Sequence, residues 1–460
     1  MFRSLIGDKA FYKRLAALAL PIMVQTGITN LVNMVDNIMV GSLGNSEMTG
    51  VAIANQLLFV FNLCVFGACS GAGIFGAQFY GKQDHKGVRD TFRFRLIFCS
   101  LFAVAAIVLF IFAGGSLISL YLRGEGSAQT AALSLGFGEE YLRVMLIGLL
   151  PYTIAQCYSS TLRETDKSLP PMIAGVCAVV VNLCLNYVLI FGKLGAPRLG
   201  VTGAAMATVI SRWVELAVVA GWTHKRKDIN GFIVGAYKSL RVPLSLVGNI
   251  MRKGMPLMVN EALWSSGIAF INQCLSVRGQ DVVAANNISQ TFWNVFSVAF
   301  LSFGTAIGII LGHMLGKGEL EKVKPECRKL TAFTVTLSVI VAAIYIPLSF
   351  IIPDIYNSTA EIKQLATSLM IISAVAMPID AFAHSTYFTL RSGGKTFITF
   401  LFDSGFVWCI SLPIAFILSR YTSISILLLF AITQFINIFK CLLGGYLVHK
   451  GSWIRNIVSE

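Results

Sequence analysis

Acidic and amide side chains lie at helical spacing inside one long apolar stretch near the start of this 460-residue chain. The stretch, residues 18–44, places Gln25, Thr29, Asn33 and Asp36 at spacings of four, four and three, along one stripe of a helix. It is longer than the about 20 residues that cross a bilayer. A carboxylate at membrane depth is costly unless it faces protein or water. Asp36 is therefore a candidate for binding a cation or exchanging a proton.

Further amides of the first half are candidates for surrounding this acid. Asn182 and Asn186 are four residues apart in the run VNLCLNYVLIFG, so they share one helix face. Together with Asn33 and Asp36 they would form a pocket of one acid and several amide oxygens, which suits a cation or a proton relay. Buried amides also serve as hydrogen bonds between membrane helices, and that alternative stays open.

The second half carries two acids of its own inside apolar stretches, Glu261 and Asp380. Trp264 follows the first acid by three residues, and Tyr387 follows the second by seven. Two acids on separate helices that face each other titrate as a coupled pair, so that one can exchange a proton for a cation. We therefore predict coupling roles for both, with a candidate sodium site at Glu261 and Asp380. Alternatively, one acid caps a helix or pairs with a base, for example Asp380 with Arg391.

Other polar and aromatic residues of the apolar stretches are candidates for lining a substrate cavity. An aromatic ring such as Trp264 or Trp293 attracts an organic cation through its face. Asp403, at the head of an apolar stretch, is predicted to lie at the membrane interface. The candidate cavity residues are Asn33, Asn182, Asn186, Trp264, Asn287, Gln290 and Tyr387.

The composition indicates that the helices carrying these residues lie in a membrane, since 56% of the chain is hydrophobic and only 13% is charged. The long apolar runs indicate helices and not the short alternating segments of a barrel. We predict an all-α integral membrane protein. Its twelve spans are expected at residues 12–42, 48–80, 92–114, 137–162, 170–192, 200–222, 247–277, 283–316, 328–351, 362–391, 397–419 and 422–447.

The chain contains the same unit twice. Pro21 in ALPIMVQ corresponds to Pro256 in GMPLMVN at an offset of 235 (256 − 21), and TLRETDKS from Thr161 corresponds to TLRSGGKT from Thr389 at an offset of 228 (389 − 161). Each half has an even number of spans, so both enter the membrane the same way round, as in parallel-repeat transporters. We predict two homologous six-helix bundles, 1–222 and 247–460, related by a pseudo-two-fold axis along the membrane normal and joined by a cytoplasmic linker, 223–246.

The net charge of +14 does not indicate nucleic-acid binding. When the predicted spans alternate in direction, 27 of the 36 Lys and Arg residues lie in the termini and loops on one side of the membrane. This is the positive-inside pattern of a multi-pass protein of the cell membrane with both termini in the cytoplasm. The N-terminus shows no cleavable signal. The expected partners are the lipid bilayer and a small molecule, and the chain is expected to act as a monomer.

Enzyme signatures are missing from the sequence. There is no H-E-x-x-H metal site, and SGGKT at Ser392 lacks the first glycine of a phosphate-binding loop. The ten cysteines include no C-x-x-C pair, and we interpret them as small packing residues, not as disulfides or metal ligands. We therefore expect no enzyme activity and no cofactor, and energy for uphill transport would come from an ion gradient.

In combination, these features resemble the multidrug and toxic compound extrusion (MATE) family. The segments that carry the resemblance are ALPIMVQ…NMVDNIMVG, GMPLMVNEALWSSG, VNLCLNYVLIFG and LRSGGKT, and it extends over essentially the whole chain. It implies two six-helix bundles and export of organic cations by sodium or proton antiport through alternating access.

Within this family, Asp36 matches the acid of helix 1, while Glu261 and Asp380 match the helix-7 and helix-10 acids of the bacterial NorM-type branch. Asn186 stands where the DinF-type branch usually has an aspartate. The resemblance is therefore nearer to the NorM-type branch and favours Glu261 and Asp380 as the coupling pair.

Two other functions remain open from the sequence. A flippase for lipid-linked precursors shares this architecture, but its anionic substrate calls for several arginines within the spans, and only Arg143 and Arg212 lie well inside. A channel or a receptor is the other alternative, although repeats with differently placed acids suit a carrier better.

Overall fold

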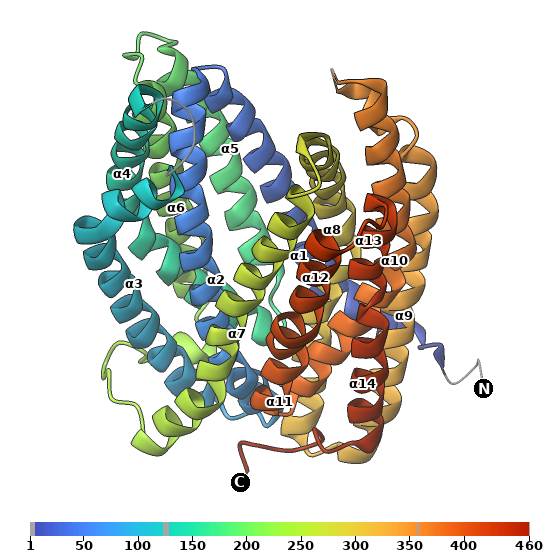
Figure 1. The fold of residues 1–460 in the computed structure, drawn as a ribbon. Coiled ribbons are helices and arrows are strands. Elements are labelled where there is room, and N and C mark those ends of the chain that lie inside the picture. The colour runs from blue at the N-terminus through green and yellow to red at the C-terminus, as the bar shows by residue number, and fades with distance from the viewer. Residues whose placement is uncertain (1–4, 123–127, 357, 460) are drawn as a thin grey trace. The chain divides into compact units, whose positions relative to one another are not determined.

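The computed structural model describes residues 5–122, 128–356 and 358–459, which are helical over most of their length and contain no strand (Figure 1). The first half comprises α1 (Lys9–Gly41), α2 (Asn45–Gly81), α3 (His85–Tyr121), α4 (Ala128–Glu164), α5 (Leu169–Phe191), α6 (Gly200–Lys225) and the 3₁₀ turn η2 (Gly231–Ile233). The second half begins with α7 (Leu244–Ser276), α8 (Gln280–Lys317), α9 (Leu320–Leu348), the turn η3 (Ile352–Ile355) and α10 (Ala360–Ser392).

The last two helical segments are less regular. One runs from Thr396 to Tyr421 and comprises α11 (Thr396–Phe400), the π-helical turns η4 (Leu401–Gly405) and η5 (Val407–Ser411), and α12 (Leu412–Tyr421). The other runs from Ile426 to Lys450 and comprises α13 (Ile426–Phe435) and α14 (Asn437–Lys450).

The predicted all-α membrane fold of twelve helical segments is confirmed. Among the described residues, ten of the segments are long and apolar enough to cross a bilayer. The other two, α4 and α7, are 37 and 33 residues long, but polar residues such as Glu140 and Asn260 interrupt their apolar runs.

The sequence repeat recurs in where the helices start. Helices α7, α8 and α9 begin at the same offset of 235 from α1, α2 and α3 respectively (244 − 9, 280 − 45 and 320 − 85). Pro21 and Pro256 occupy the same position inside α1 and α7. Each proline removes one backbone hydrogen bond from a helix interior, which favours a bend there.

The internal contacts divide the chain into two compact units. One unit contains residues 24–76 and 84–251, and the other contains residues 1–23, 77–83 and 252–460. The second unit thus holds the start of α1 and the last residues of α2 besides the second-half helices. The division of the sequence at 222 and 247 into homologous bundles with a linker stays a prediction.

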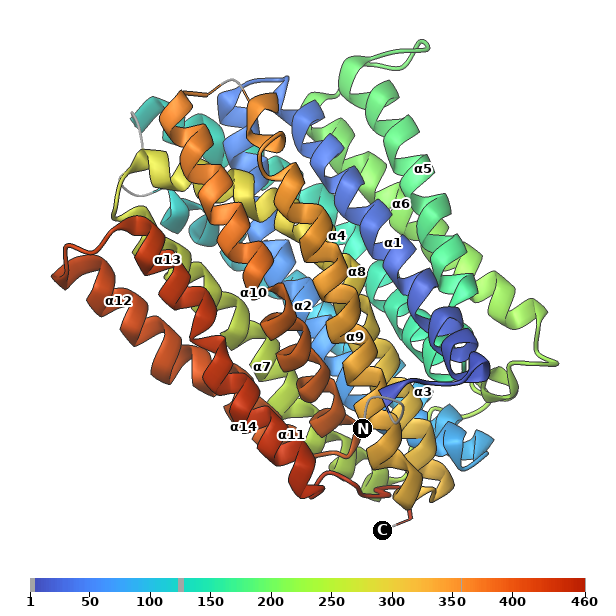
Figure 2. The ribbon, with the colours of Figure 1, turned by 90° about the vertical axis from the view of Figure 1, so that its right-hand side faces the viewer.

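In the unit that holds most of the second half, α10 is the central helix. It packs against α8, α9, α13 and α14, and Figure 2 shows α8, α9 and α10 running side by side. Gly304 of α8 lets the ring of His384 approach, because a Cβ there would lie 2.5 Å from the ring. The core between α8, α9 and α10 is apolar and includes Ile307, Leu330 and Phe388.

The ends of several helices in this unit meet at one buried glutamine, Gln78 of α2. Its side-chain nitrogen donates to the backbone oxygens of Ser392 (3.0 Å) and Arg455 (3.2 Å), and its oxygen accepts from the backbone nitrogen of Ile457 (2.8 Å). Gln78 is fully buried. The side chain therefore satisfies carbonyl groups at the end of α10 and fixes the C-terminal tail to it.

In the other unit, α4 packs against α3 and α6, and α6 packs against α5. The segment after α6 is held to α3 by two arginines. Arg89 donates to the backbone oxygen of Val234 (2.7 Å), and Arg93 donates to those of Gly235 (2.7 Å) and Ala236 (2.8 Å). The basic residues at the start of α3 thus hold the segment that follows α6 against α3.

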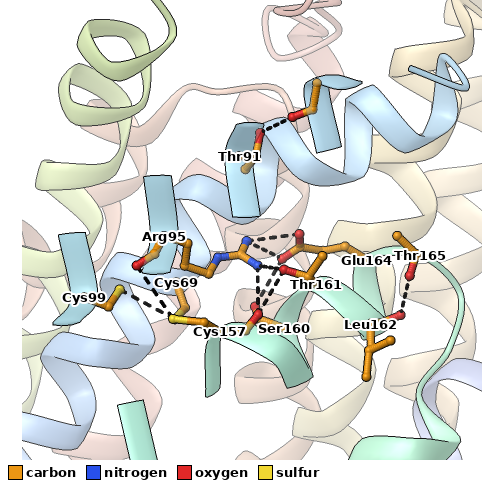
Figure 3. Close-up of polar contacts among 11 residues, drawn as sticks. Cys69, Thr91, Arg95, Cys99, Cys157, Ser160, Thr161, Leu162, Glu164 and Thr165 are labelled. Atoms are coloured by element: carbon orange, nitrogen blue, oxygen red, sulfur yellow. Dashed lines mark hydrogen bonds and ion pairs between the residues drawn. The ribbon is translucent and has the colours of Figure 1, made fainter. Parts of the chain in front are cut away.

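A buried ion pair joins α3 to α4 (Figure 3). Arg95 donates to both carboxylate oxygens of Glu164 at 2.8 and 3.0 Å and to Thr161 Oγ1 at 2.5 Å. The Arg95 side chain is 0% exposed and that of Glu164 is 6% exposed. Gly73 of α2 makes room for this pair, because a Cβ there would lie 2.6 Å from the Glu164 Oε1 atom. A Cβ at Gly76 would collide with Glu164 Oε2.

Removal of the buried carboxylate tests how strongly this ion pair stabilises the unit. Glu164→Ala leaves the Arg95 guanidinium buried and unneutralised, which should lower the free energy of unfolding by about 3–5 kcal/mol. The measurement is unfolding of the purified protein in mixed micelles with increasing SDS. The matched control is Glu139→Ala, since Glu139 pairs with Arg143 on the exposed face of α4, where the loss should be at most about 1 kcal/mol. Equal losses for the two variants would contradict this account.

Candidate functional site

The acid of α1 is held by two asparagines of α5. Asn186 Nδ2 donates to Asp36 Oδ1 at 2.6 Å. With the Asn182 amide oriented so that both its atoms are satisfied, its nitrogen lies 3.0 Å from Asp36 Oδ2 and its oxygen accepts from Thr208 Oγ1 at 3.3 Å. Both asparagines are buried and Asp36 is half-buried. The predicted grouping of Asp36, Asn182 and Asn186 is thus present.

Other members of the predicted α1 stripe lie elsewhere. Asn33 is exposed, and its side chain makes no hydrogen bond within the part of the chain that the structure describes. Gln25 accepts from Arg163 NH2 at 2.8 Å. The polar face of α1 therefore contacts α5 at Asp36 and α4 at Gln25, while Asn33 contributes nothing to either contact.

In the second half, Glu261 belongs to a hydrogen-bonded network that joins α7 to α10. Tyr387 of α10 donates to Glu261 Oε1 at 3.1 Å. The adjacent residue, Asn260, donates to the Tyr387 hydroxyl at 3.3 Å. Asn260 is fully buried and Tyr387 is 7% exposed. Tyr387 thus links the Glu261 carboxylate to the interior of the unit, and its role in a substrate cavity stays a prediction.

Asn260 also joins this network to the irregular segment after α10. Its nitrogen donates to Asp403 Oδ2 at 3.0 Å, and its side-chain oxygen accepts from the Ser404 backbone nitrogen at 3.2 Å and from Ser404 Oγ at 2.7 Å. Asp403 and Ser404 lie in the π-helical turn η4. A π turn frees backbone groups from the regular helical pattern, and here a side chain from α7 bonds to one of them.

Helix α14 provides partners for two acids from one face. Lys440 forms an ion pair with Asp403, and the two side chains are 11% and 13% exposed. Asn437, three residues earlier, donates to Asp380 Oδ1 at 3.3 Å. Residues three apart share a helix face, so α14 bridges the acids of α10 and η4. Asp380 itself forms no ion pair among the described residues.

The remaining predicted cavity residues are scattered over α7 and α8. Trp264 is 36% exposed, whereas Gln290 and Trp293 are half-buried. Asn287 is exposed and lines a pocket of about 270 Å³ with Thr291 and Tyr356. The described contacts do not gather these residues into one site.

Each half thus has acidic side chains inside its helical segments. Asp36 in the first half bonds to amides, and the acids of the second half bond to amides, a tyrosine and a lysine. The MatE family profile matches residues 21–188 and 256–417, which covers both halves of this arrangement. This chain belongs to the MatE family. The matched regions include Asp36, Glu261, Asp380 and Asp403.

Relatives of this MatE protein are named as probable multidrug resistance proteins. A "Probable multidrug resistance protein NorM" of Thermotoga maritima is 27% identical over 425 residues, which are 90% of this chain and 87% of the relative. A "Probable multidrug resistance protein YoeA" of Bacillus subtilis is 24% identical over 422 residues, 90% and 89% of the two chains. The resemblance to NorM-type MATE proteins predicted from the sequence is confirmed.

The fold agrees with solved MATE structures. The Vibrio cholerae MATE transporter VcmN, in the form of a mutant, superposes with a TM-score of 0.87 at 17% identity, over 98% of this chain and 99% of the other. At this identity the likeness establishes the fold alone. Together with the family match and the apolar spans, this makes the chain a multi-pass membrane protein of the MatE family.

The structure of this MatE chain differs from the sequence analysis around Asp403. Its side chain is 13% exposed and is paired with Lys440, which the sequence analysis did not foresee, while its expected place at the membrane interface stays a prediction. Sequence reasoning missed Lys440 as an intramembrane cation, although it lies inside an apolar run. It also missed Asn260. This residue precedes Glu261 where the apolar run of α7 is interrupted, and that position could have indicated a polar contact. No direct bond joins Glu261 to Asp380 among the described residues, so their coupling stays a prediction.

A double-mutant cycle tests the Lys440–Asp403 pair. Lys440→Met leaves a buried carboxylate without its cation and should lower the free energy of unfolding by about 3–5 kcal/mol. Adding Asp403→Asn should recover part of this loss, since the unneutralised charge is then gone. SDS unfolding of the two single variants and the double variant gives the coupling energy. Additive losses would show that the two residues do not interact.

Proposed function

We propose that this MatE protein is a secondary active exporter in the cell membrane. It moves organic cations out of the cell by alternating access, in exchange for inward movement of sodium ions or protons. Both termini lie in the cytoplasm, and one chain is the working unit. The small-molecule cargo is consistent with the multidrug resistance names of the NorM and YoeA relatives.

The observation that carries the proposal is the bonding of Asp36 and Asp380. Each lies inside a membrane helix and is hydrogen-bonded to asparagine side chains, and neither forms an ion pair in the described parts of the chain. A carboxylate in such surroundings is stable when it is protonated or when it binds a cation. Both acids are therefore suited to take up the coupling ion.

Glu261 is the third coupling acid in this proposal, while Asp403 has a different role. The Asp403 charge is balanced by Lys440, so Asp403 has less need of a further cation. Glu261 is bonded by the hydroxyl of Tyr387, which can donate to the charged carboxylate or accept from the protonated acid. Tyr387 and Asn260 then connect a change of charge at Glu261 to η4 and α14.

Coupling follows if the ion and the organic cation favour different states. A ligand shifts a conformational equilibrium only by its difference in affinity for the two states. Neutralising the acids from outside removes negative charge that holds an organic cation, so the cargo is released there. Inward movement of one charge supplies about 2.3 kcal/mol per 100 mV of membrane potential.

Efflux of a fluorescent organic cation from proteoliposomes tests the proposal. We expect efflux to be stimulated by an inward sodium gradient or by an inward proton gradient, each imposed alone. Asp36→Asn, Glu261→Gln and Asp380→Asn keep the side-chain shape but remove the charge, so gradient-stimulated efflux should be lost in at least one of them. The matched control, Asp228→Asn, removes an exposed carboxylate paired with Arg226 and should transport normally.

Three results would contradict the proposal. Efflux that ignores both gradients would favour a flippase, which transfer of a fluorescent lipid-linked precursor would then reveal. Steady ion currents without cargo would indicate a channel. Normal coupling in all three acid variants, with normal folding by size-exclusion chromatography, would mean that the coupling site lies elsewhere.

A further inference from the structure

Three cysteines that are far apart in the sequence meet inside the first-half unit. They are Cys69 of α2, Cys99 of α3 and Cys157 of α4, and all three are buried. Their sulfur atoms lie within 4.8 Å of one another, with Cys69 and Cys99 at 3.9 Å. Figure 3 shows Cys69, Cys99 and Cys157 grouped together beside Arg95.

The repeat argues against a general packing role for this cluster. At the same offsets of 235 (304 − 69 and 334 − 99) and 228 (385 − 157), the second half has Gly304, Thr334 and Ser385 in place of the three cysteines. The C-terminal counterpart thus packs without thiols. Small apolar side chains would suffice for packing in either half, so the convergence of three thiols calls for another explanation.

We propose that Cys69, Cys99 and Cys157 form a three-coordinate site for a soft metal ion, with copper(I) as the ion that fits best. Three sulfurs placed evenly around an ion at about 2.3 Å are about 4.0 Å apart. The Cys69 and Cys99 sulfurs are already at 3.9 Å and all three lie within 4.8 Å of one another, so small side-chain movements reach this spacing.

The donor set selects among metals. Thiolates prefer soft ions such as copper(I), whereas sodium and magnesium prefer oxygen. Zinc normally completes a tetrahedron with a fourth ligand, and the described residues include no fourth His, Cys or carboxylate within the cluster. Three sulfurs without a fourth ligand therefore favour copper(I).

A cationic side chain lies beside the cluster. Arg95, four residues before Cys99, is fully buried; its NH1 lies 3.5 Å from the Cys157 backbone oxygen, and its Nε has no hydrogen-bond partner. A neighbouring guanidinium stabilises thiolates. On binding, three copper–sulfur bonds form and three S–H protons leave to solvent, with no change in the oxidation state of copper or sulfur. The charge left on the complex is two negative units, and Arg95, the cation beside it, also pairs with Glu164.

Anaerobic titration with copper(I) tests the site. Reduced full-length protein in detergent competes with the chromophoric copper(I) chelator bicinchoninate, and we expect it to take up one copper ion per chain. Loss of an outer-sphere partner already weakens metal affinity about 10–100-fold, so Cys69→Ser, Cys99→Ser or Cys157→Ser should weaken it further. The matched control is Cys327→Ser, because Cys327 is a buried cysteine beside Thr389 in the other unit. Its copper uptake should equal that of the unaltered protein.

Two further measurements keep the test independent of how well the variants fold. X-ray absorption of the copper-loaded protein should give three sulfur neighbours at a single distance. Copper(I) should also slow alkylation of Cys69, Cys99 and Cys157 but not of Cys327, as read by mass spectrometry of the unaltered chain. Two or fewer sulfur neighbours, unchanged alkylation, or equal copper uptake by the Cys157→Ser variant would overturn the proposal.

Discussion

The absence of water inside a bilayer is the constraint on which this structure depends. Every buried charge must find a partner within the protein, and the partners come from other helices. The charge of Arg95 is paired with Glu164, and the charge of Lys440 is paired with Asp403. These bonds join α3 to α4 and η4 to α14. The same requirement that makes intramembrane charge costly therefore also selects which helices lie together.

Against this background the acids without cations are exceptional. Asp36 and Asp380 receive hydrogen bonds from asparagines, which stabilise a carboxylate without neutralising it. Structural ion pairs and acids able to exchange an ion thus occur in the same protein, and their partners tell them apart. A lysine or arginine partner keeps the carboxylate negatively charged, whereas an amide partner leaves the acid able to take up a proton or a cation.

The helices and their repeat could be predicted from the sequence because they depend on local apolar runs and on an internal alignment. The contacts of Asp36 with Asn182 and Asn186 were also within reach, since both segments show polar residues at helical spacing. The Lys440–Asp403 pair was not, because it depends on which helices pack together and on the π turn around Asp403. The meeting of three cysteines from three helices was invisible for the same reason.

The repeat extends to contacts that differ in chemistry. Gln25 packs against Gly175 in the first half, and the corresponding residues of the second half, Asn260 and Asp403, form a hydrogen bond. The offsets are again 235 (260 − 25) and 228 (403 − 175). One geometry therefore holds a glutamine that also accepts from Arg163 in one half, and an asparagine bonded to a carboxylate in the other.

The close approach of Glu164 to α2 constrains how this chain can change over generations. Gly73 and Gly76 leave the space that the carboxylate occupies, and Arg95 neutralises it. A larger residue at either glycine is compatible with the fold only if Glu164 becomes smaller, and Arg95 must then lose its charge as well. These four positions, which span three helices, are consequently expected to covary among descendants of the same ancestor, with the glycines present wherever the ion pair persists.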